Sequence, residues 1–406
     1  MIHPKKFWIT KKIKGKAMKN EKLTRREAIK KTVGVGLSTG AVMGAPQWIL
    51  PALAQGEELV SFSDMPEGYS RGPARPGAPH WLDTRMISDF YTDNLDFYVV
   101  QHYGQPDVDI DSYRLKVTGL VEKELEYTLA DLQNLSQFEI DAGFECGGNN
   151  AGRFQGLVGN AKWKGIRLSS LLNASGITSD GTEVVFFGAD SGTEEIPNRD
   201  TEVEQSFARS LPVSEAMREE NMLALEMNGE ELPQGHGFPA RLLIPGHYGV
   251  ANVKWLTQIH VQDRRYMGRF MGRDYVTLKK EMVGGEERWV ENSVTKIQLK
   301  SAIVRVTRLG AQHKISGFVL TDGTPLRSVE IKIDDGPWRE ADLDSRSTRY
   351  SWKLFTMDWS PSAGNHTLVS RAIDINGHVQ LTEEEMPEKA SRWENHAQFP
   401  RAITIS

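Results

Sequence analysis

The sequence predicts an α+β fold in which a mixed α/β domain is followed by an all-β, immunoglobulin-like sandwich. Two observations carry this prediction. From residue 97 onward, short runs typical of strands are broken by short helical segments. After about Thr295 the helical segments stop, and alternating apolar and polar runs are separated by Asp-Gly and Asn-Gly turns. The length of 406 residues, with 39% apolar and 25% charged side chains, suits two or three soluble domains.

Residues 1–54 are expected to be an export signal and not part of the fold. Residues 1–31 carry 12 Lys and Arg against two acidic residues, residues 32–56 carry no charge, and Ala52-Leu53-Ala54 offers small residues for cleavage. The pair Arg25-Arg26 resembles a twin-arginine signal, which predicts export of the folded protein to the periplasm. The alternative is a retained membrane anchor, but the apolar stretch is short and interrupted by two prolines.

The charge of the chain depends on whether this signal is removed. From residue 55 onward, 37 Lys and Arg stand against 52 Asp and Glu, a net charge of −15. Such an acidic body argues against nucleic acid and anionic membranes as partners. A basic protein partner would suit it, as would the absence of a partner.

The expected order is an irregular strap over 55–85, the mixed domain over 86–290 and the sandwich over 297–406. Within the mixed domain, Thr128 should cap a first helix, Ser169 or Ser170 a second, and Gly176 should end the second. The predicted elements of this domain are strands at Tyr113–Val117, Glu183–Phe187 and Arg241–Ile244, helices at Leu129–Leu135 and Ser169–Ala174, a weaker helix at Ser210–Met217, and a crossover segment over 266–295.

The last domain is expected to be a packed module without a binding site. Its turns should form at Asp322-Gly323, Asp335-Gly336-Pro337 and Asn376-Gly377. Its core should contain Trp338, Trp352 and Trp359. The predicted strands are Ile297–Val306, Lys314–Leu320, Ser328–Ile333, Tyr350–Phe355 and His366–Ile373.

Cys146 is the single cysteine of the chain, and it is followed by Gly147, Gly148 and Asn149. One thiol cannot form an internal disulfide, a CxxC pair or a CxxCH haem attachment. A buried structural thiol, a nucleophile, or a lone thiolate ligand to a soft metal whose other ligands come from a cofactor remain open. The two glycines are expected to leave room for a bulky group beside the backbone, and the Asn to supply hydrogen bonds.

Four stretches around this cysteine and beyond resemble one family, the sulfite oxidases, which are molybdopterin-dependent oxidoreductases. The resemblance covers about residues 85–406. It implies a molybdopterin-binding domain followed by a dimerisation domain, and therefore a homodimer through residues 297–406. The stretches are Phe144–Asn149 with Gly159–Leu168, Leu225–Arg241, Pro245–Leu256, and Asp334–Ala341.

The resemblance also implies a cofactor, which is one molybdenum-molybdopterin per chain without a nucleotide extension and without haem. Its dithiolene would supply two sulfurs to the metal, and Cys146 the third. His236 and Arg241 are expected to aim at one anion of the cofactor, and the Asn252 and Val253 backbone to donate amides beside Lys254. The implied cofactor-binding residues are Tyr98, Val99, Val100, Gln101, His102, Asp190, His236, Arg241, Asn252, Val253 and Lys254.

The activity that the resemblance implies is oxidation of sulfite to sulfate. Cys146, Tyr275 and Arg392 would then be the catalytic residues. The tyrosine would hydrogen-bond the substrate or a metal-bound oxygen, and the arginine would belong to the anion pocket. The printed sequence has no CxxCH motif and no iron–sulfur cysteines, so the electron acceptor is expected to be a separate c-type cytochrome.

Two positions depart from the family pattern. Val100 and Ala151 stand where sulfite oxidases place arginines, and Arg153 lies two positions further on. Each lost charge-assisted hydrogen bond would weaken the binding of a small dianion by about 1.5–3 kcal/mol. Three hypotheses follow: an exported sulfite dehydrogenase, the same centre acting on sulfane sulfur or reducing a sulfoxide, and a cofactor-free scaffold. Retention of the thiol and of the basic residues argues against the scaffold.

Overall fold

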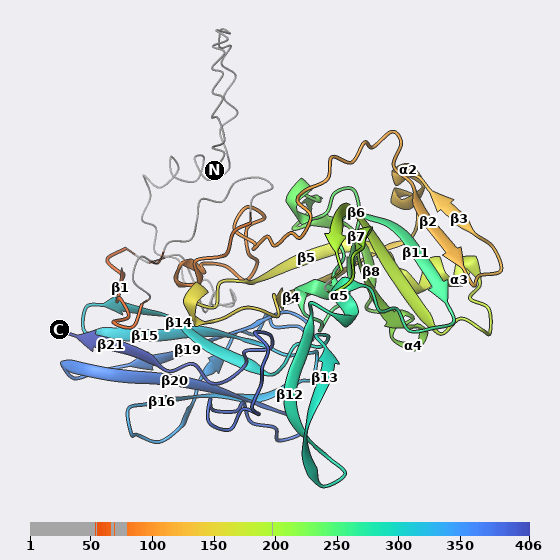
Figure 1. The fold of residues 1–406 in the computed structure, drawn as a ribbon. Coiled ribbons are helices and arrows are strands. Elements are labelled where there is room, and N and C mark those ends of the chain that lie inside the picture. Colours follow the sequence, from red (N-terminus) through yellow and green to blue (C-terminus); the bar gives the residue numbers. More distant parts are fainter. Residues whose placement is uncertain (1–52, 54, 66–68, 70–78, 197) are drawn as a thin grey trace, which may run out of the picture. The chain divides into compact units, whose positions relative to one another are not determined.

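The computed structural model describes residues 53, 55–65, 69, 79–196 and 198–406. The predicted export signal over residues 1–54 therefore lies outside the described residues, apart from Leu53. Within the described part of the chain, no helix is long and apolar enough to cross a membrane. The described elements form the predicted α+β architecture, in which a mixed domain precedes a β-sandwich (Figure 1).

The mixed domain is built on two sheets. One has the strand order β3-β2-β11-β6-β7, with β11 parallel to β2 and antiparallel to β6. The other has the order β10-β8-β5-β4, with β9 paired to β8. The strands are β2 (Leu115–Gly119), β3 (Leu125–Tyr127), β4 (Gln137–Glu145), β5 (Val158–Arg167), β6 (Glu183–Glu195), β7 (Glu202–Pro212), β8 (Met222–Met227), β9 (Glu230–Glu231), β10 (Arg241–Leu243) and β11 (Leu256–Gln262).

Short helices connect these strands, and their ends test the predicted caps. Thr128 caps α2 (Leu129–Gln133) in a capping box with Asp131, as predicted. Gly176, at φ +68°, ends α3 (Leu168–Ser175), also as predicted. The predicted serine caps of α3 are wrong, because the helix begins earlier and its N-cap residue makes no side-chain bond. The third helix shrinks to α4 (Val213–Ala216), since the residues before it extend β7.

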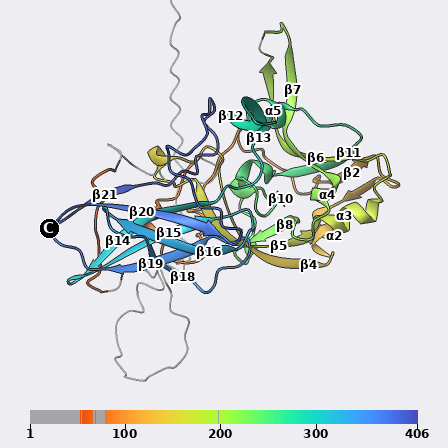
Figure 2. The same cartoon turned by 90° about the horizontal axis from the view of Figure 1, so that it is seen from below.

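The sandwich consists of two sheets with the orders β1-β14-β15-β19-β18 and β17-β16-β20-β21 (Figure 2). Part of the predicted strap forms β1 and pairs with β14, so it belongs to this sheet. Trp352 and Trp359 are buried as predicted, whereas Trp338 is only half-buried and its ring contacts Lys332 and Arg371. The strands are β1 (Glu58–Leu59), β14 (Lys300–Leu309), β15 (Gln312–Leu320), β16 (Leu326–Ile333), β17 (Arg339–Glu340), β18 (Asp342–Leu343), β19 (Lys353–Trp359), β20 (Gly364–Asp374) and β21 (Arg401–Ile405).

The predicted crossover segment is more regular than expected. It contains a short helix, α5 (Arg269–Gly272), and a hairpin of β12 (Val276–Val283) and β13 (Glu286–Ser293). Figure 1 shows this hairpin extending from the mixed domain beside the sandwich strands. Backbone bonds tie it to the C-terminal segment, from Lys280 N to Glu388 O at 2.8 Å and from Ala390 N to Leu278 O at 2.9 Å.

Four 3-10 turns complete the described elements. They are η1 (Thr84–Met86), η2 (Ala151–Arg153), η3 (Gln234–His236) and η4 (Gly249–Ala251). Two of them, η3 and η4, lie in the stretches that the sequence analysis singled out.

Candidate functional site

One cavity gathers most of the predicted site residues. It lies where the segment after Phe97, the end of β4, the turns η3 and η4, and the start of β12 meet. Val99, Val253 and Arg392 are not part of its lining, and Val99 instead pairs through its backbone with His80. The predicted residues that line it are Tyr98, Val100, Gln101, His102, Cys146, Asp190, His236, Arg241, Asn252, Lys254 and Tyr275.

Cys146 directly follows β4 and opens a loop that its own polar side chains hold in shape. Its N–H donates to Leu157 O at 3.0 Å. The Asn149 amide donates to Glu145 Oε2 and to Gln155 O, and its carbonyl accepts from Leu157 N, each at 3.0 Å. Asn149 therefore supplies the hydrogen bonds that the sequence predicted for it, and it supplies them to the loop.

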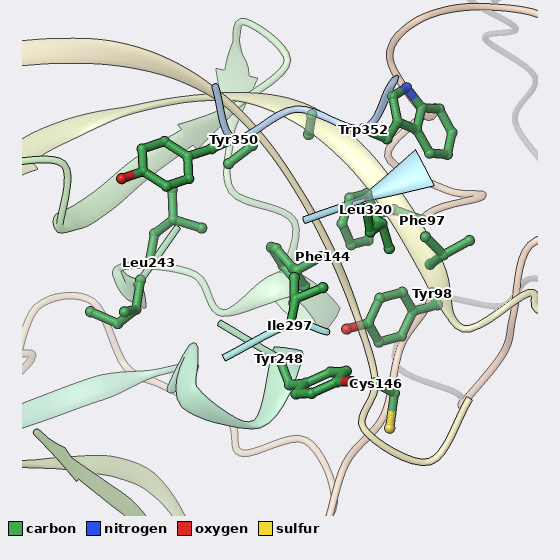
Figure 3. Packing of buried hydrophobic residues seen from close by; sticks show 14 of the residues in the cluster. Phe97, Tyr98, Phe144, Cys146, Leu243, Tyr248, Ile297, Leu320, Tyr350 and Trp352 are labelled. Atoms are coloured by element: carbon green, nitrogen blue, oxygen red, sulfur yellow. The ribbon is translucent and has the colours of Figure 1, made fainter. Parts of the chain in front are cut away.

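The thiol itself is buried beside Tyr98 and Tyr248 (Figure 3). Burial raises the pKa of the Cys146 thiol above its ordinary value, and the Gly148 amide opposes this shift. The charges of Arg153 and Arg392 oppose it as well. Burial therefore keeps Cys146 in the unreactive thiol form. A positive charge nearby is needed to convert it to a thiolate.

Gly147 and Gly148 are explained by protein packing. A Cβ on Gly147 would lie 2.9 Å from Val294 Cγ1, and one on Gly148 would lie 3.0 Å from the ring of Trp393. The bulky group beside this backbone is therefore an indole from the C-terminal segment. The prediction that something large approaches the loop is confirmed, and the structure identifies a side chain in that place.

Arg241 is fully buried, and no carboxylate among the described residues pairs with it. Its Nη1 donates to His236 O at 3.0 Å and its Nη2 to Asn252 O at 3.1 Å, while Nε has no partner in the part of the chain that the structure describes. The ring faces of Phe144 and Trp163 lie 5.5 and 5.1 Å from its Cζ. Burial lowers its pKa to about 10, which still leaves it charged at neutral pH.

His236 does not act as a second cation beside Arg241. Its Nε2 lies 2.8 Å from Asn94 O, and because a carbonyl can only accept, Nε2 must carry the proton. Burial lowers its pKa to about 3, so the ring is neutral and offers an acceptor at Nδ1. The expectation that His236 and Arg241 aim together at one anion is therefore wrong in this geometry.

Lys254 and Asp190 line the same cavity, and the charge of each one shifts the pKa of the other. The Lys254 ammonium donates to Gly235 O at 3.0 Å and lies 4.2 Å from the centre of the Trp255 ring. Burial lowers its pKa to about 7, and the charge of Arg241 adds to this effect. Burial raises the pKa of Asp190 to about 6, against the pull of Lys254. Both groups can change their charge state near neutral pH.

The amides of Asn252 and Val253 are not free donors. They donate to Gly249 O and Ala251 O at 3.1 Å each, as part of the η4 turn. The Asn252 side chain bonds Ile244 N and Tyr248 O, which fixes the turn beside Arg241. The prediction of backbone donors at this position is therefore wrong, and these two residues shape the wall instead.

Tyr275 and His102 form a direct pair. The tyrosine hydroxyl lies 2.8 Å from His102 Nε2, although the two residues are far apart in sequence. The imidazole stacks on Phe207, with centroids 4.8 Å apart. Part of His102 stays exposed, but its apolar surroundings and the charges of Lys254 and Arg269 lower its pKa to about 4. Burial raises the pKa of Tyr275 above its ordinary value, so its hydroxyl stays protonated.

The two departures from the family pattern differ in position. Val100 lines the cavity, so an apolar group stands where the resemblance expects an arginine. Ala151 is exposed in η2, and Arg153 at the other end of that turn is exposed as well. Arg153 contacts the Trp81 ring at 5.9 Å, and Arg392 contacts the Trp393 ring at 4.4 Å. Both arginines lower the pKa of the Cys146 thiol, which places their charges within electrostatic range of it.

The residues present fit a polar, anionic heterocyclic group. Tyr98 OH, Gln101 Nε2, Asp190 Oδ1 and Arg241 Nε are buried and have no hydrogen-bond partner among the described residues. Buried polar atoms are rarely left unpaired, so a ligand with donors and acceptors would satisfy them. Within the described residues, no group of three or more His, Cys, Asp and Glu could hold a metal alone. A metal at Cys146 would therefore need further ligands from the bound heterocyclic molecule.

Sequence reasoning missed three features of this site. Arg209 is a buried cation held by Phe270 O and Val294 O, and it acts on Tyr275 electrostatically. Trp393 packs against the Cys146 loop and Tyr275. Lys300 reaches Glu145 from the sandwich. Each acts across a large sequence separation, and none belongs to a local motif.

Comparison with known proteins gives a consistent result. Residues 102–270 match the oxidoreductase molybdopterin binding domain family. The chain is 30% identical to human mitochondrial sulfite oxidase over 329 residues, which cover 73% of this chain and 58% of that protein. It is 28% identical to the mitochondrial sulfite oxidase of Drosophila melanogaster over 330 residues, which cover 73% of this chain and 56% of that protein. The chain thus spans little more than half the length of these relatives.

Among solved structures, the sulfane dehydrogenase SoxCD from Paracoccus pantotrophus shares the fold. The match has a TM-score of 0.69 and 23% sequence identity, and it covers 91% of this chain and 96% of that one. This likeness agrees with the predicted order of a mixed α/β domain and a β-sandwich.

Proposed function

We propose that this chain, which belongs to the sulfite oxidase family of molybdopterin-dependent oxidoreductases, oxidises a small sulfur compound, with sulfite to sulfate as the first candidate. One observation carries the proposal. The single thiol of the chain lines the same cavity as two cationic side chains and four buried polar atoms that find no hydrogen-bond partner among the residues that the structure describes. A cavity of this kind, with few convergent polar groups and shifted pKa values, is the usual form of a cofactor site.

The bound cofactor would supply the two-electron redox chemistry that protein side chains lack. Cys146 would hold its metal through the thiolate, because a soft sulfur donor suits a metal with other sulfur ligands. Asp190, Tyr98 and Gln101 would hydrogen-bond its heterocycle. Lys254 and the free Nε of Arg241 would bind its anionic end.

Tyr275 and His102 would orient the substrate and handle its proton. Since His102 is neutral above about pH 4, its Nε2 either accepts from the tyrosine hydroxyl or donates to it. In the second arrangement the phenol proton is free to bond a substrate oxygen in the cavity. The pair can therefore switch a hydrogen bond toward the substrate without creating a buried charge.

Oxidation of sulfite with water as the oxygen source yields sulfate, two protons and two electrons. The electrons need an acceptor outside this chain, and we propose a basic c-type cytochrome because the body of the chain carries a net charge of −15. The twin-arginine segment supports export to the periplasm, where the signal would be removed. We further propose that the sandwich makes a homodimer, which light scattering of the purified protein would test.

A second candidate rests on Val100. This apolar side chain in the cavity wall favours a substrate with less charge than sulfite, such as a protein-bound sulfane sulfur or, in the reductive direction, a sulfoxide. The remaining cations, Lys254 and Arg241, are buried on the side of Asp190 and would be engaged by the cofactor.

Two measurements separate these candidates. Molybdenum content of the purified protein tests whether the chain holds the cofactor at all. Steady-state assays then compare oxidation of sulfite and of thiol-linked sulfane sulfur with ferricyanide as the electron acceptor, and reduction of a sulfoxide with a reduced viologen dye as the electron donor. Turnover of sulfite at micromolar to millimolar concentration supports the first candidate. Turnover of only the other compounds supports the second.

A further inference from the structure

Trp393 lies between the two reactive groups of the site. Its indole stacks on the ring of Tyr275, with centroids 4.3 Å apart and planes inclined by 20°. Its Nε1 donates to Asp274 O at 2.7 Å, so it also holds the backbone that carries Tyr275. The side chain is 6% exposed.

The same indole closes the Cys146 loop from the other side. Its Cζ3 and Cε3 atoms would lie 3.0 and 3.3 Å from a Cβ at Gly148, which means that the ring rests directly on that backbone. The next residue donates from Glu394 N to Gly147 O at 2.8 Å. Asn395 Nδ2 donates to Asn149 O at 3.0 Å. Three consecutive residues of the C-terminal segment therefore hold the loop.

The C-terminal segment is itself held in an unusual conformation. Glu394 has φ +58°, in the left-handed region that non-glycine residues seldom adopt. Lys389 Nζ donates to Trp393 O, Glu394 O and Asn395 Oδ1 at 2.9, 3.2 and 2.7 Å. A strained backbone that is fastened by one ammonium group persists only where the surroundings determine it. The surrounding contacts therefore fix the conformation of the segment that carries Trp393.

We propose that Trp393 is a positioning residue that fixes both the Tyr275 hydroxyl and the Cys146 thiol in the cavity. The inference rests on the proposed function and adds a residue from the second domain to it. Stacking limits rotation of the Tyr275 ring, which keeps its hydroxyl at His102. Packing on Gly148 prevents the loop from moving away from Tyr98 and the cavity. Removal of the indole would free both groups at once.

The single cysteine of the chain gives a test that does not depend on activity. In the full-length, cofactor-free protein, the rate of Cys146 modification by a thiol reagent reports only on this loop. We expect Trp393→Ala to raise that rate about tenfold, and Trp393→Phe, which keeps a ring on Tyr275 and Gly148, to raise it much less. Trp338→Ala, in the same domain but against Lys332 and Arg371, is the matched control and should change nothing.

The loaded enzyme gives the second readout. Trp393→Ala should lower kcat about tenfold at unchanged molybdenum content, and Trp393→Phe should recover most of it. In a Tyr275→Phe background, whose hydroxyl is already lost, Trp393→Ala should lower kcat much less. If Trp393→Ala does not fold, Trp393→Leu replaces it, since leucine fills the space without stacking.

Equal modification rates in wild type, Trp393→Ala and Trp393→Leu would overturn the inference. So would equal losses in the wild-type and Tyr275→Phe backgrounds, because the indole would then act without regard to the tyrosine. A wild-type protein without molybdenum would instead contradict the proposed function. The modification rates would still decide whether Trp393 holds the loop.

Discussion

Lys300 Nζ lies 3.0 Å from Glu145 Oε2, and both side chains are almost completely excluded from solvent. Glu145 is the residue before Cys146, and Lys300 begins β14 of the sandwich. The same carboxylate oxygen accepts from Asn149, which shapes the cysteine loop. The second domain is therefore joined to the site by a buried ion pair as well as by Trp393.

Breaking this pair should destabilise the protein strongly. Lys300→Met leaves the Glu145 carboxylate buried without its cation, and we expect a loss of about 3–5 kcal/mol in the free energy of unfolding. Chemical unfolding of the cofactor-free chain measures it. Lys314→Met is the matched control, because its pair with Asp358 is exposed and should contribute less than about 1 kcal/mol. Losses of similar size in the two variants would contradict the role given to the buried pair.

Val100→Arg tests the substrate. If the position corresponds to the missing family arginine, the new guanidinium should contact a dianion in the cavity and lower KM for sulfite about tenfold or more. Val203→Arg, on the exposed face of β7, controls for the added charge. Steady-state kinetics with ferricyanide provides the measurement. An unchanged KM in Val100→Arg would mean that this side chain does not reach the substrate.

His247 gives the stability a defined pH dependence. Burial lowers its pKa from 6.5 to about 4, and the charges of Lys296 and Arg218 also lower it. Its folded pKa lies below its unfolded pKa, so the unfolded state binds more protons between these values. The part of the unfolding free energy that depends on a neutral His247 is therefore fully present above pH 6.5, and it is lost as the pH falls toward 4. His247→Asn should therefore flatten the decline of unfolding free energy over this window by roughly 1–3 kcal/mol. If the unfolding free energies of the wild type and of His247→Asn decline in parallel, His247 is not the source of the pH dependence.

Reduction of the acceptor should depend on ionic strength. A basic c-type cytochrome is attracted to a body with a net charge of −15, so added salt should slow its reduction. Ferricyanide is an anion and should show the opposite dependence, which makes it the control acceptor. Stopped-flow rates over a salt series measure both. If the rate of cytochrome reduction does not change with salt concentration, electrostatic attraction does not guide this acceptor to the chain.

The sequence predicted those parts of the site that depend on local motifs. The Asn149 bonds within the Cys146 loop, the cap at Thr128 and the stop at Gly176 each act within a few residues, so their chemistry can be deduced from neighbours. The meeting of Cys146, Tyr275 and the segment after Phe97 in one cavity came from the family resemblance. The order of the two domains followed from the change in pattern near Thr295.

The remaining features depend on contacts that no local pattern encodes. The hairpin β12–β13 was predicted as a crossover because its charged faces hide the strand alternation. The amides of Asn252 and Val253 were predicted as donors, but the η4 turn uses them internally. His236 was predicted as an anion ligand, and its protonation follows only from the carbonyl that it meets in space.

The most direct test of the account is X-ray absorption at the molybdenum edge of the purified protein and of Cys146→Ser. We predict one sulfur ligand fewer in the variant, with the fold retained because serine is nearly isosteric, and a loss of turnover because an oxygen donor replaces a soft thiolate. The same number of sulfur ligands in both proteins would contradict the assignment of Cys146 as the metal ligand, and with it the function proposed for this chain.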